Sequence, residues 1–97
     1  MTEFPTASVP SAVTLNGMME KVERTVYTVL PDTTTTICQL VMRNGYNVLG
    51  TSACVDKSKY NRALGEKYAY EDAINKLWPL EGYLLAEMRY SMFAEHD

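Results

Sequence analysis

The 97-residue sequence has one histidine, two cysteines and no long apolar run. Histidine and cysteine are common metal ligands, but Cys38 and Cys54 lack the spacing of a metal site and His96 stands next to the end of the sequence, so no metal site is expected. Two cysteines are too few for a disulfide framework, and we interpret both as free thiols in the core. A bilayer-spanning helix needs about 20 apolar residues, so no membrane association is expected.

Positive charge is also scarce, because 12 acidic residues outnumber nine basic ones and the net charge is −3. Such a molecule has no general attraction for the phosphate backbone of a nucleic acid. The first residues lack the basic and apolar regions of a signal peptide, which predicts a cytosolic protein. The hydrophobic content of 46% fits one small globular domain. Because a domain of this size buries its surface incompletely, we expect a homo-oligomer.

Residues 1–10 contain two prolines without periodicity and are predicted to form a flexible arm ahead of a single domain, 11–97. Thr14 suits the N-cap of a short helix through about Val22. The β-branched and aromatic residues that follow predict a strand that ends at Pro31-Asp32.

The next segment holds two β-prone runs joined by Asn44-Gly45, the pair that favours a two-residue type I′ hairpin turn. This turn predicts a register in which Leu40 lies opposite Leu49. Both faces of the resulting sheet carry apolar side chains. The second face should therefore be covered by the N-terminal helix or by another subunit.

Residues 63–85 carry the longest helical pattern, with apolar side chains on one broad side. Pro79 cannot continue the hydrogen-bond ladder, so a break is predicted at Trp78-Pro79, before a second helical segment to about Phe93. The predicted fold class is α+β: a short N-terminal helix, a three-stranded antiparallel β-meander and a long C-terminal helix broken at Trp78-Pro79. The predicted core residues are Leu40, Leu49, Ile74, Leu77, Trp78 and Leu84.

Three cations, Lys57, Lys59 and Arg62, gather where the long helix is predicted to begin, with Asp56 or Ser58 as its N-cap. Cations oppose the helix dipole at this end, so their clustering requires either solvent or an anion. Free N–H groups at a helix start could hold a phosphate or a carboxylate. The alternative is a solvated run of surface charge.

Lys67 and Glu71 are one helical turn apart and are predicted to project into the apolar side of the helix. Buried charges are rarely unpaired. One interpretation is a structural ion pair whose stems lie along the rim of the core. The other is a pair that faces a pocket or a subunit interface.

The segments N-G-Y-x-V-x-G-x-S-A-C-V-D and G-x-K-x-A-x-E-D-A-x-x-K-x-W-P-L-E-G-Y-L-L together cover about residues 37–85. In these segments the sequence resembles a family of small phage and prophage proteins, typified by the gene product 49 and gene product 66 members of two tailed enterobacterial phages. The most specific part is the block from Trp78 to Leu84. The resemblance implies an accessory phage gene and a life in the host cytoplasm. It supplies no assigned activity and no catalytic residues.

The first functional hypothesis is a non-enzymatic phage accessory protein, active in counter-defence, that sequesters an anionic, nucleotide-like host ligand as an oligomer. The three cations would hold the anion, and Tyr60 or Tyr68 would stack on a base. The predicted ligand-binding residues are Lys57, Ser58, Lys59, Tyr60, Arg62, Lys67 and Glu71.

The alternative is a protein-interaction module that inhibits or redirects a host protein through Tyr83, Met88, Tyr90 and Met92. Ordinary core or dimer packing is the other explanation of this stripe. Nucleic-acid binding is a third, weaker hypothesis because the chain is acidic. Catalysis is not expected, because the candidate side chains lack a nearby histidine and an orienting third group. No cofactor is predicted.

Overall fold

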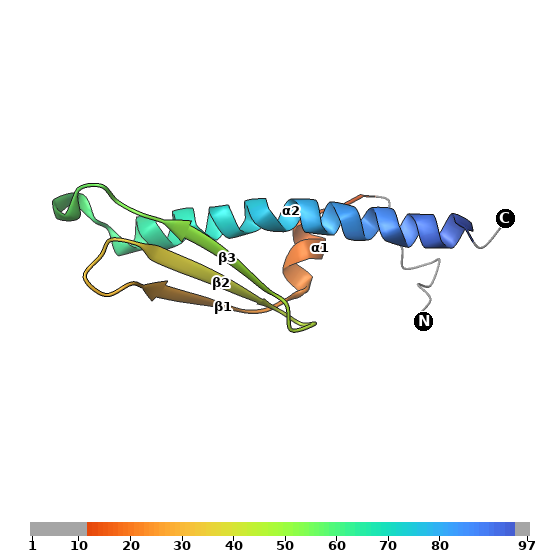
Figure 1. The fold of residues 1–97 in the computed structure, drawn as a ribbon, viewed down its shortest axis with the longest axis horizontal. Coiled ribbons are helices and arrows are strands. Elements are labelled where there is room, and N and C mark those ends of the chain that lie inside the picture. The colour runs from red at the N-terminus through yellow and green to blue at the C-terminus, as the bar shows by residue number, and fades with distance from the viewer. Residues whose placement is uncertain (1–11, 95–97) are drawn as a thin grey trace.

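A computed structural model describes residues 12–94, in which a long helix lies along one face of a small sheet (Figure 1). The sheet is antiparallel with strand order β1-β2-β3, which confirms the predicted α+β class and the three-stranded meander. The predicted flexible arm, 1–10, lies outside the described residues. The elements in chain order are α1 (Leu15–Glu20), β1 (Val22–Val29), β2 (Thr36–Met42), β3 (Asn47–Ser52), the short 3₁₀ helix η2 (Lys57–Lys59) and α2 (Arg62–Ala94).

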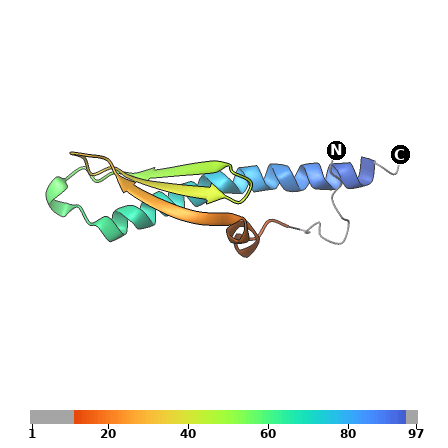
Figure 2. The same ribbon diagram turned by 90° about the horizontal axis from the view of Figure 1, so that it is seen from below.

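The N-terminal helix α1 begins as predicted. The Thr14 side chain accepts a hydrogen bond from the Gly17 N–H at 3.0 Å, which satisfies one of the free donors at the helix start. Met18 points from α1 into the core and is almost fully buried. The short helix therefore closes one end of the core beneath α2 (Figure 2).

The hairpin between β2 and β3 has a three-residue loop, so the predicted type I′ turn is wrong. Met42 accepts a hydrogen bond from the Gly45 N–H at 2.9 Å and donates its own N–H to Tyr46 at 2.8 Å. Gly45 has φ 91°, whereas Asn44 does not have the positive φ that a type I′ turn requires there. The Asn44 side chain instead accepts the Tyr46 N–H at 2.9 Å, which stabilises the longer turn.

The longer loop shifts the strand register by one residue from the prediction. Leu40 lies opposite Val48, not Leu49. Because side chains alternate between the two faces of a strand, this shift moves Leu49 from the predicted core to the outer face, where it is 50% exposed. Val48 takes its place under α2 and is buried.

The inner face of the sheet packs closely against α2 because its contacts are made by small residues. Gly50 on β3 is buried, and a Cβ there would collide with the backbone of Ala69 and Ala73. The core continues through Ile74 and Leu77, as predicted. Met18 of α1 joins this same inner cluster, so of the two predicted coverings of the outer face the N-terminal helix is wrong, and another subunit stays a prediction.

The long helix does not break at Trp78-Pro79, contrary to prediction, but runs as one element from Arg62 to Ala94. Proline has no N–H, so the carbonyl of Asn75, four residues earlier, loses its intrahelical partner. Pro79 and Asn75 are both exposed, so water can satisfy that carbonyl. Trp78 is 37% exposed, which corrects its assignment to the core, and Leu84 is only half-buried.

The structure divides α2 into two halves. Residues 62–77, the sheet-packed half, lie on β2 and β3, whereas residues 78–93, the distal half, extend beyond the end of the sheet (Figure 1). The molecule is accordingly elongated, with extents of 61 × 20 × 18 Å. Lys21, just after α1, forms an ion pair with Glu81 at 2.7 Å and so joins the N-terminal segment to the start of the distal half.

Candidate functional site

The predicted anion site lies at the end of the molecule opposite the distal half of α2, but its hydroxyl group is already bonded. Lys57–Lys59 form η2, which Asp56 caps by accepting the Ser58 N–H at 3.0 Å and the Ser58 hydroxyl at 2.7 Å. Both bonds hold the pKa of the Asp56 carboxyl below its ordinary value, and the bond from the hydroxyl has the larger effect. Ser58 therefore offers an anion neither of these donors.

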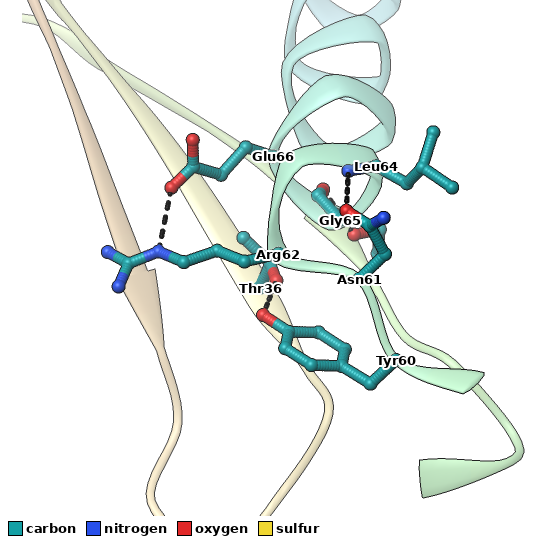
Figure 3. A network of polar contacts seen from close by, with 8 residues as sticks. Thr36, Tyr60, Asn61, Arg62, Leu64, Gly65 and Glu66 are labelled. Carbon is teal, nitrogen blue, oxygen red and sulfur yellow. Dashed lines mark hydrogen bonds and ion pairs between the residues drawn. The ribbon is translucent and has the colours of Figure 1, made fainter. Parts of the chain in front are cut away.

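The start of α2 is occupied by protein groups as well. Asn61, rather than the predicted Asp56 or Ser58, caps the helix by accepting the Leu64 N–H at 3.2 Å (Figure 3). Arg62 forms an ion pair with Glu66 at 3.1 Å, one turn along the helix. Both devices reduce the capacity of this helix end to hold an external anion.

Tyr60 lies against the sheet, not in open solvent. Its hydroxyl is 3.4 Å from the Thr36 hydroxyl on β2 (Figure 3), and its side chain is half-buried. The ring also lies close to Gly65, where an added Cβ would be in van der Waals contact with it. Tyr60 therefore works as a packing residue between the loop and α2.

Lys67 and Glu71 do not project into the core, which corrects their predicted position. Both are exposed, and within residues 12–94 the structure shows no ion pair between them. The buried side of α2 runs instead through Ala69, Ala73 and Leu77. The predicted side was centred on large apolar residues, whereas the side that meets the sheet is formed mainly by alanines. Lys67 lies over the Tyr68 ring, with its Nζ 5.9 Å from the ring centroid.

What remains of the predicted site is a shallow hollow of about 100 Å³. Lys59, Tyr60 and Tyr68 line it together with polar groups of the preceding loop. Lys57 and Lys59 are exposed and, among the described residues, pair with no carboxylate. Ligand pockets for small molecules typically measure about 300–1,000 Å³, so this hollow in one chain is too small to enclose a nucleotide.

Larger hollows flank the Lys21–Glu81 ion pair, where no site residue was predicted. One, of about 350 Å³, lies between the β2–β3 hairpin and α2, with Met42, Leu77 and Leu80 in its wall. The other, of about 300 Å³, lies between the N-terminal segment and the distal half of α2. The apolar residues after Pro79 were a sequence signal for these hollows. The predicted break in the helix separated these residues from the preceding turns, whereas in the structure they continue the surface of the same helix.

Exposed aromatic side chains are concentrated on the distal half of α2. Tyr83 and Tyr90 are each 69% exposed, Phe93 is 60% exposed and Leu80 is 43% exposed. Among the residues of the predicted interaction stripe, Met88 and Met92 are half-buried, so the exposed part consists of the tyrosines. This is the largest group of exposed aromatic side chains on one element in the described part of the chain.

Three titratable groups lie where the sheet-packed half of α2 meets the sheet: Tyr27 on β1, Cys38 on β2 and Tyr70 on α2 itself. Burial raises the pKa of the Cys38 thiol and of the Tyr27 and Tyr70 hydroxyls. The Tyr70 hydroxyl lies 3.2 Å from the Met19 sulfur. Cys38 and Cys54 are both free thiols, as predicted, but only Cys38 lies in the core, because Cys54 is half-buried in the loop after β3. A buried thiol with a raised pKa is a structural residue, because the thiolate is the reactive form.

Among residues 12–94, no three histidine, cysteine, aspartate or glutamate side chains come together in a way that could hold a metal ion. No helix in this part of the chain combines the length and apolar character that a bilayer crossing requires.

Residues 12–88, most of the chain, match the model of the family described as Phage protein (N4 Gp49/phage Sf6 gene 66). The matched range includes the sheet, both helices' packing contacts and the Trp78 to Leu84 block. We found no match among curated proteins or among solved structures. The chain belongs to the N4 Gp49/phage Sf6 gene 66 family of phage proteins.

Proposed function

We propose that this phage protein is a non-enzymatic accessory factor that acts in the host cytoplasm by binding a host protein through the distal half of α2. The observation that carries the proposal is the exposure of Tyr83 and Tyr90, each 69%, on a helix that extends beyond its own sheet. The two tyrosines are seven residues apart and so lie on one side of the helix. Tyrosine is enriched at protein interfaces, where it supplies contact area and a hydrogen bond with little loss of side-chain entropy.

The hollows beside the Lys21–Glu81 pair support the same surface. They lie next to the start of the distal half, and their walls combine apolar side chains with charged rims. Interfaces typically have an apolar centre and a polar rim. A partner that contacts Leu80 and Tyr83 would therefore meet a recess as well as an exposed stripe.

A second candidate function is capture of an anionic, nucleotide-like host ligand, which would serve counter-defence by removing a signal. The observation that favours it is that Lys57 and Lys59 are exposed beside the hollow lined by Tyr60 and Tyr68. Because that hollow is about 100 Å³, an enclosed nucleotide site would require a second chain to complete it.

One experiment separates the two candidates with variants at opposite ends of the molecule. A photo-crosslinking residue at Glu87, which lies between the two tyrosines in sequence, is introduced into the wild-type chain, the Tyr83→Ala/Tyr90→Ala chain and the Lys57→Ala/Lys59→Ala chain. Each is expressed in infected cells. We expect one discrete host-protein adduct that persists in the lysine variant and falls at least about tenfold in the tyrosine variant, since buried interface tyrosines often contribute about 2 kcal/mol.

The same three preparations are then examined by native mass spectrometry with identification of released small molecules. A nucleotide carried by the wild-type and tyrosine-variant chains, and lost from the lysine variant, would support the second candidate. An adduct that is unaffected by the tyrosine substitutions, or the absence of any adduct, would contradict the first.

A further inference from the structure

The two edge strands of the sheet differ in whether the described residues outside the sheet bond to their outward backbone groups. On β3, the Thr51 N–H donates to the Asp72 carboxylate at 2.9 Å, and the Leu49 carbonyl accepts from the Lys76 ammonium at 3.0 Å. Asp72 and Lys76 also pair with each other at 3.1 Å on α2. The helix thus bonds two of the outward backbone groups of this strand. Proteins commonly protect edge strands in such ways against pairing with another chain.

The β1 edge has no such protection within residues 12–94. The Leu30 N–H donates to the Thr35 carbonyl at 3.0 Å, which continues the β1–β2 register beyond the strand end. Hydrogen-bonded pairs alternate along an antiparallel ladder, so the even-numbered residues of β1 bond to β2. The odd-numbered residues Thr25, Tyr27 and Val29 therefore direct their N–H and C=O groups away from the sheet. In the described part of the chain none of these groups has a partner.

The open row of backbone groups has a defined length. At one end the ladder is interrupted by a bulge between Val22 and Arg24. At the other end stands Pro31, which has no N–H to donate. Both devices normally terminate strand pairing. Between them the sequence T-V-Y-T-V-L is uncharged, rich in β-branched residues and free of proline, a composition suited to pairing.

We propose that β1 pairs antiparallel with β1 of a second copy of this chain, about a twofold axis at Tyr27, to form a continuous six-stranded sheet. Outward-directed residues must face each other in such a pair, so Tyr27 lies opposite the partner's Tyr27, and Thr25 lies opposite the partner's Val29. Arg24 then faces the partner's Leu30, which keeps like charges apart. A twofold interface uses the same patch on both chains.

A second copy is the occupant that fits both ends of the row. In this register the bulged residue Glu23 of each chain falls beside the partner's Pro31, so pairing stops at both ends where each chain already lacks regular ladder geometry. On the helix side, Tyr27 is half-buried and packs against the core together with Met19 and Tyr70. The twofold axis would bring the two Tyr27 side chains, and the apolar residues behind them, next to each other.

The pairing involves one short strand from each chain, which is a small interface. We therefore expect a dimer that forms with a dissociation constant in roughly the micromolar range, visible as a concentration-dependent mass in sedimentation velocity. This inference does not depend on the proposed function of the distal half of α2.

The substitution that tests it is Thr25→Pro, which removes one outward N–H of β1 and, by symmetry, two hydrogen bonds of the dimer. Leu49→Pro is the matched control, because it removes an outward N–H from the β3 edge, which the dimer does not use. Both side chains are exposed. We expect the dissociation constant to rise at least about tenfold for Thr25→Pro and to stay within about twofold for Leu49→Pro. Equal effects of the two substitutions would overturn the proposal.

Amide hydrogen exchange of the wild-type chain gives a test that needs no variant to fold. The amides of Thr25, Tyr27 and Val29 should become protected as the protein concentration rises. Those of Val26 and Thr28, which bond to β2, should show no concentration dependence beyond that of global stability. A monomer at every concentration, or an oligomer in which the odd-numbered amides of β1 stay unprotected, would show that β1 is not the interface.

Discussion

The sheet-packed half of α2 presents Ala69 and Ala73 to the sheet, and both are fully buried. The distal half carries Tyr83 and Tyr90, which are mostly exposed. One continuous helix thus places alanines where it meets its own sheet and exposed tyrosines where it extends beyond the sheet. The free energy of unfolding should therefore depend on the first half, and binding to a partner on the second.

The contrast follows from the distance between the backbone of α2 and the backbone that faces it. Where Gly50 meets Ala69 and Ala73, the two backbones are so close that no Cβ fits between them. Beyond the sheet no strand lies against the helix, and an added Cβ at Gly82 meets nothing within 4 Å. Paired substitutions, one at each half, test whether the halves differ as the structure indicates.

The largest difference is expected at the two glycines. Gly50→Ala forces a Cβ into the backbone of α2, which a side-chain rotation cannot relieve, and should lower the free energy of unfolding by about 4 kcal/mol. Gly82→Ala should raise it by about 0.5–1 kcal/mol, because alanine is the better helix former. Urea denaturation followed by circular dichroism measures both. A small effect of Gly50→Ala would mean that the helix does not pack this closely on β3.

A second pair compares a buried leucine with an exposed tyrosine. Leu77 is 2% exposed at the end of the sheet-packed half, and Leu77→Ala should cost about 3 kcal/mol through lost burial and a residual cavity. Tyr83→Ala should change the free energy of unfolding by less than about 0.5 kcal/mol. If denaturation showed a large loss for Tyr83→Ala, the tyrosine would be a packing residue, and the proposed interaction surface would lose its support.

The smallest effect concerns acid stability. The hydrogen bond from the Thr51 N–H, and to a smaller extent the one from Lys76, holds the pKa of the Asp72 carboxyl below its ordinary value. A carboxyl with a lower pKa in the folded state stabilises the protein above its unfolded pKa of about 4, and this contribution disappears as the pH falls through the folded pKa. Asp72 is partly exposed, so the contribution should be below about 1 kcal/mol.

The measurement is the difference in urea midpoint between pH 7 and pH 2.5 for the wild type, for Asp72→Asn and for Glu87→Gln on the distal half. We expect Asp72→Asn to reduce the acid-induced loss and Glu87→Gln to leave it unchanged. Identical pH dependence in the wild type and Asp72→Asn would show that the carboxylate does not stabilise the β3 edge.

The elements of the fold were predictable because local patterns specify them. The Thr14 cap, the β-branched runs and the long apolar periodicity each depend on neighbours in sequence, and the α+β class followed. The register of the hairpin was not predictable from Asn44-Gly45, since that pair suits more than one turn, and the choice depended on how β3 had to face α2. A shift of one residue was enough to exchange Leu49 for Val48 in the core.

The candidate site, like the fold, was predictable from the sequence only in part. The sequence indicated the basic cluster from its composition, but the partners that occupy Ser58 and Arg62 are contacts of their own turn, which a charge pattern does not show. The exposed aromatic surface was visible in the sequence only as a choice between core packing and an interface. Whether a helical stripe is buried depends on what lies opposite it, and that is a property of the assembled fold.

The sequence by itself determined the types and order of the elements, the free thiols and the family, because these depend on residue chemistry and short-range spacing. Only the tertiary structure decided that α2 passes through Pro79, that Gly50 admits the helix, and that Asp72 and Lys76 bond to the β3 edge while none of residues 12–94 bonds to the β1 edge. Each of these outcomes is a balance between segments distant in sequence. The Asn75 carbonyl without a donor, the missing Cβ of Gly50 and the outward backbone groups of β1 affect stability or binding only through the groups that the fold places beside them.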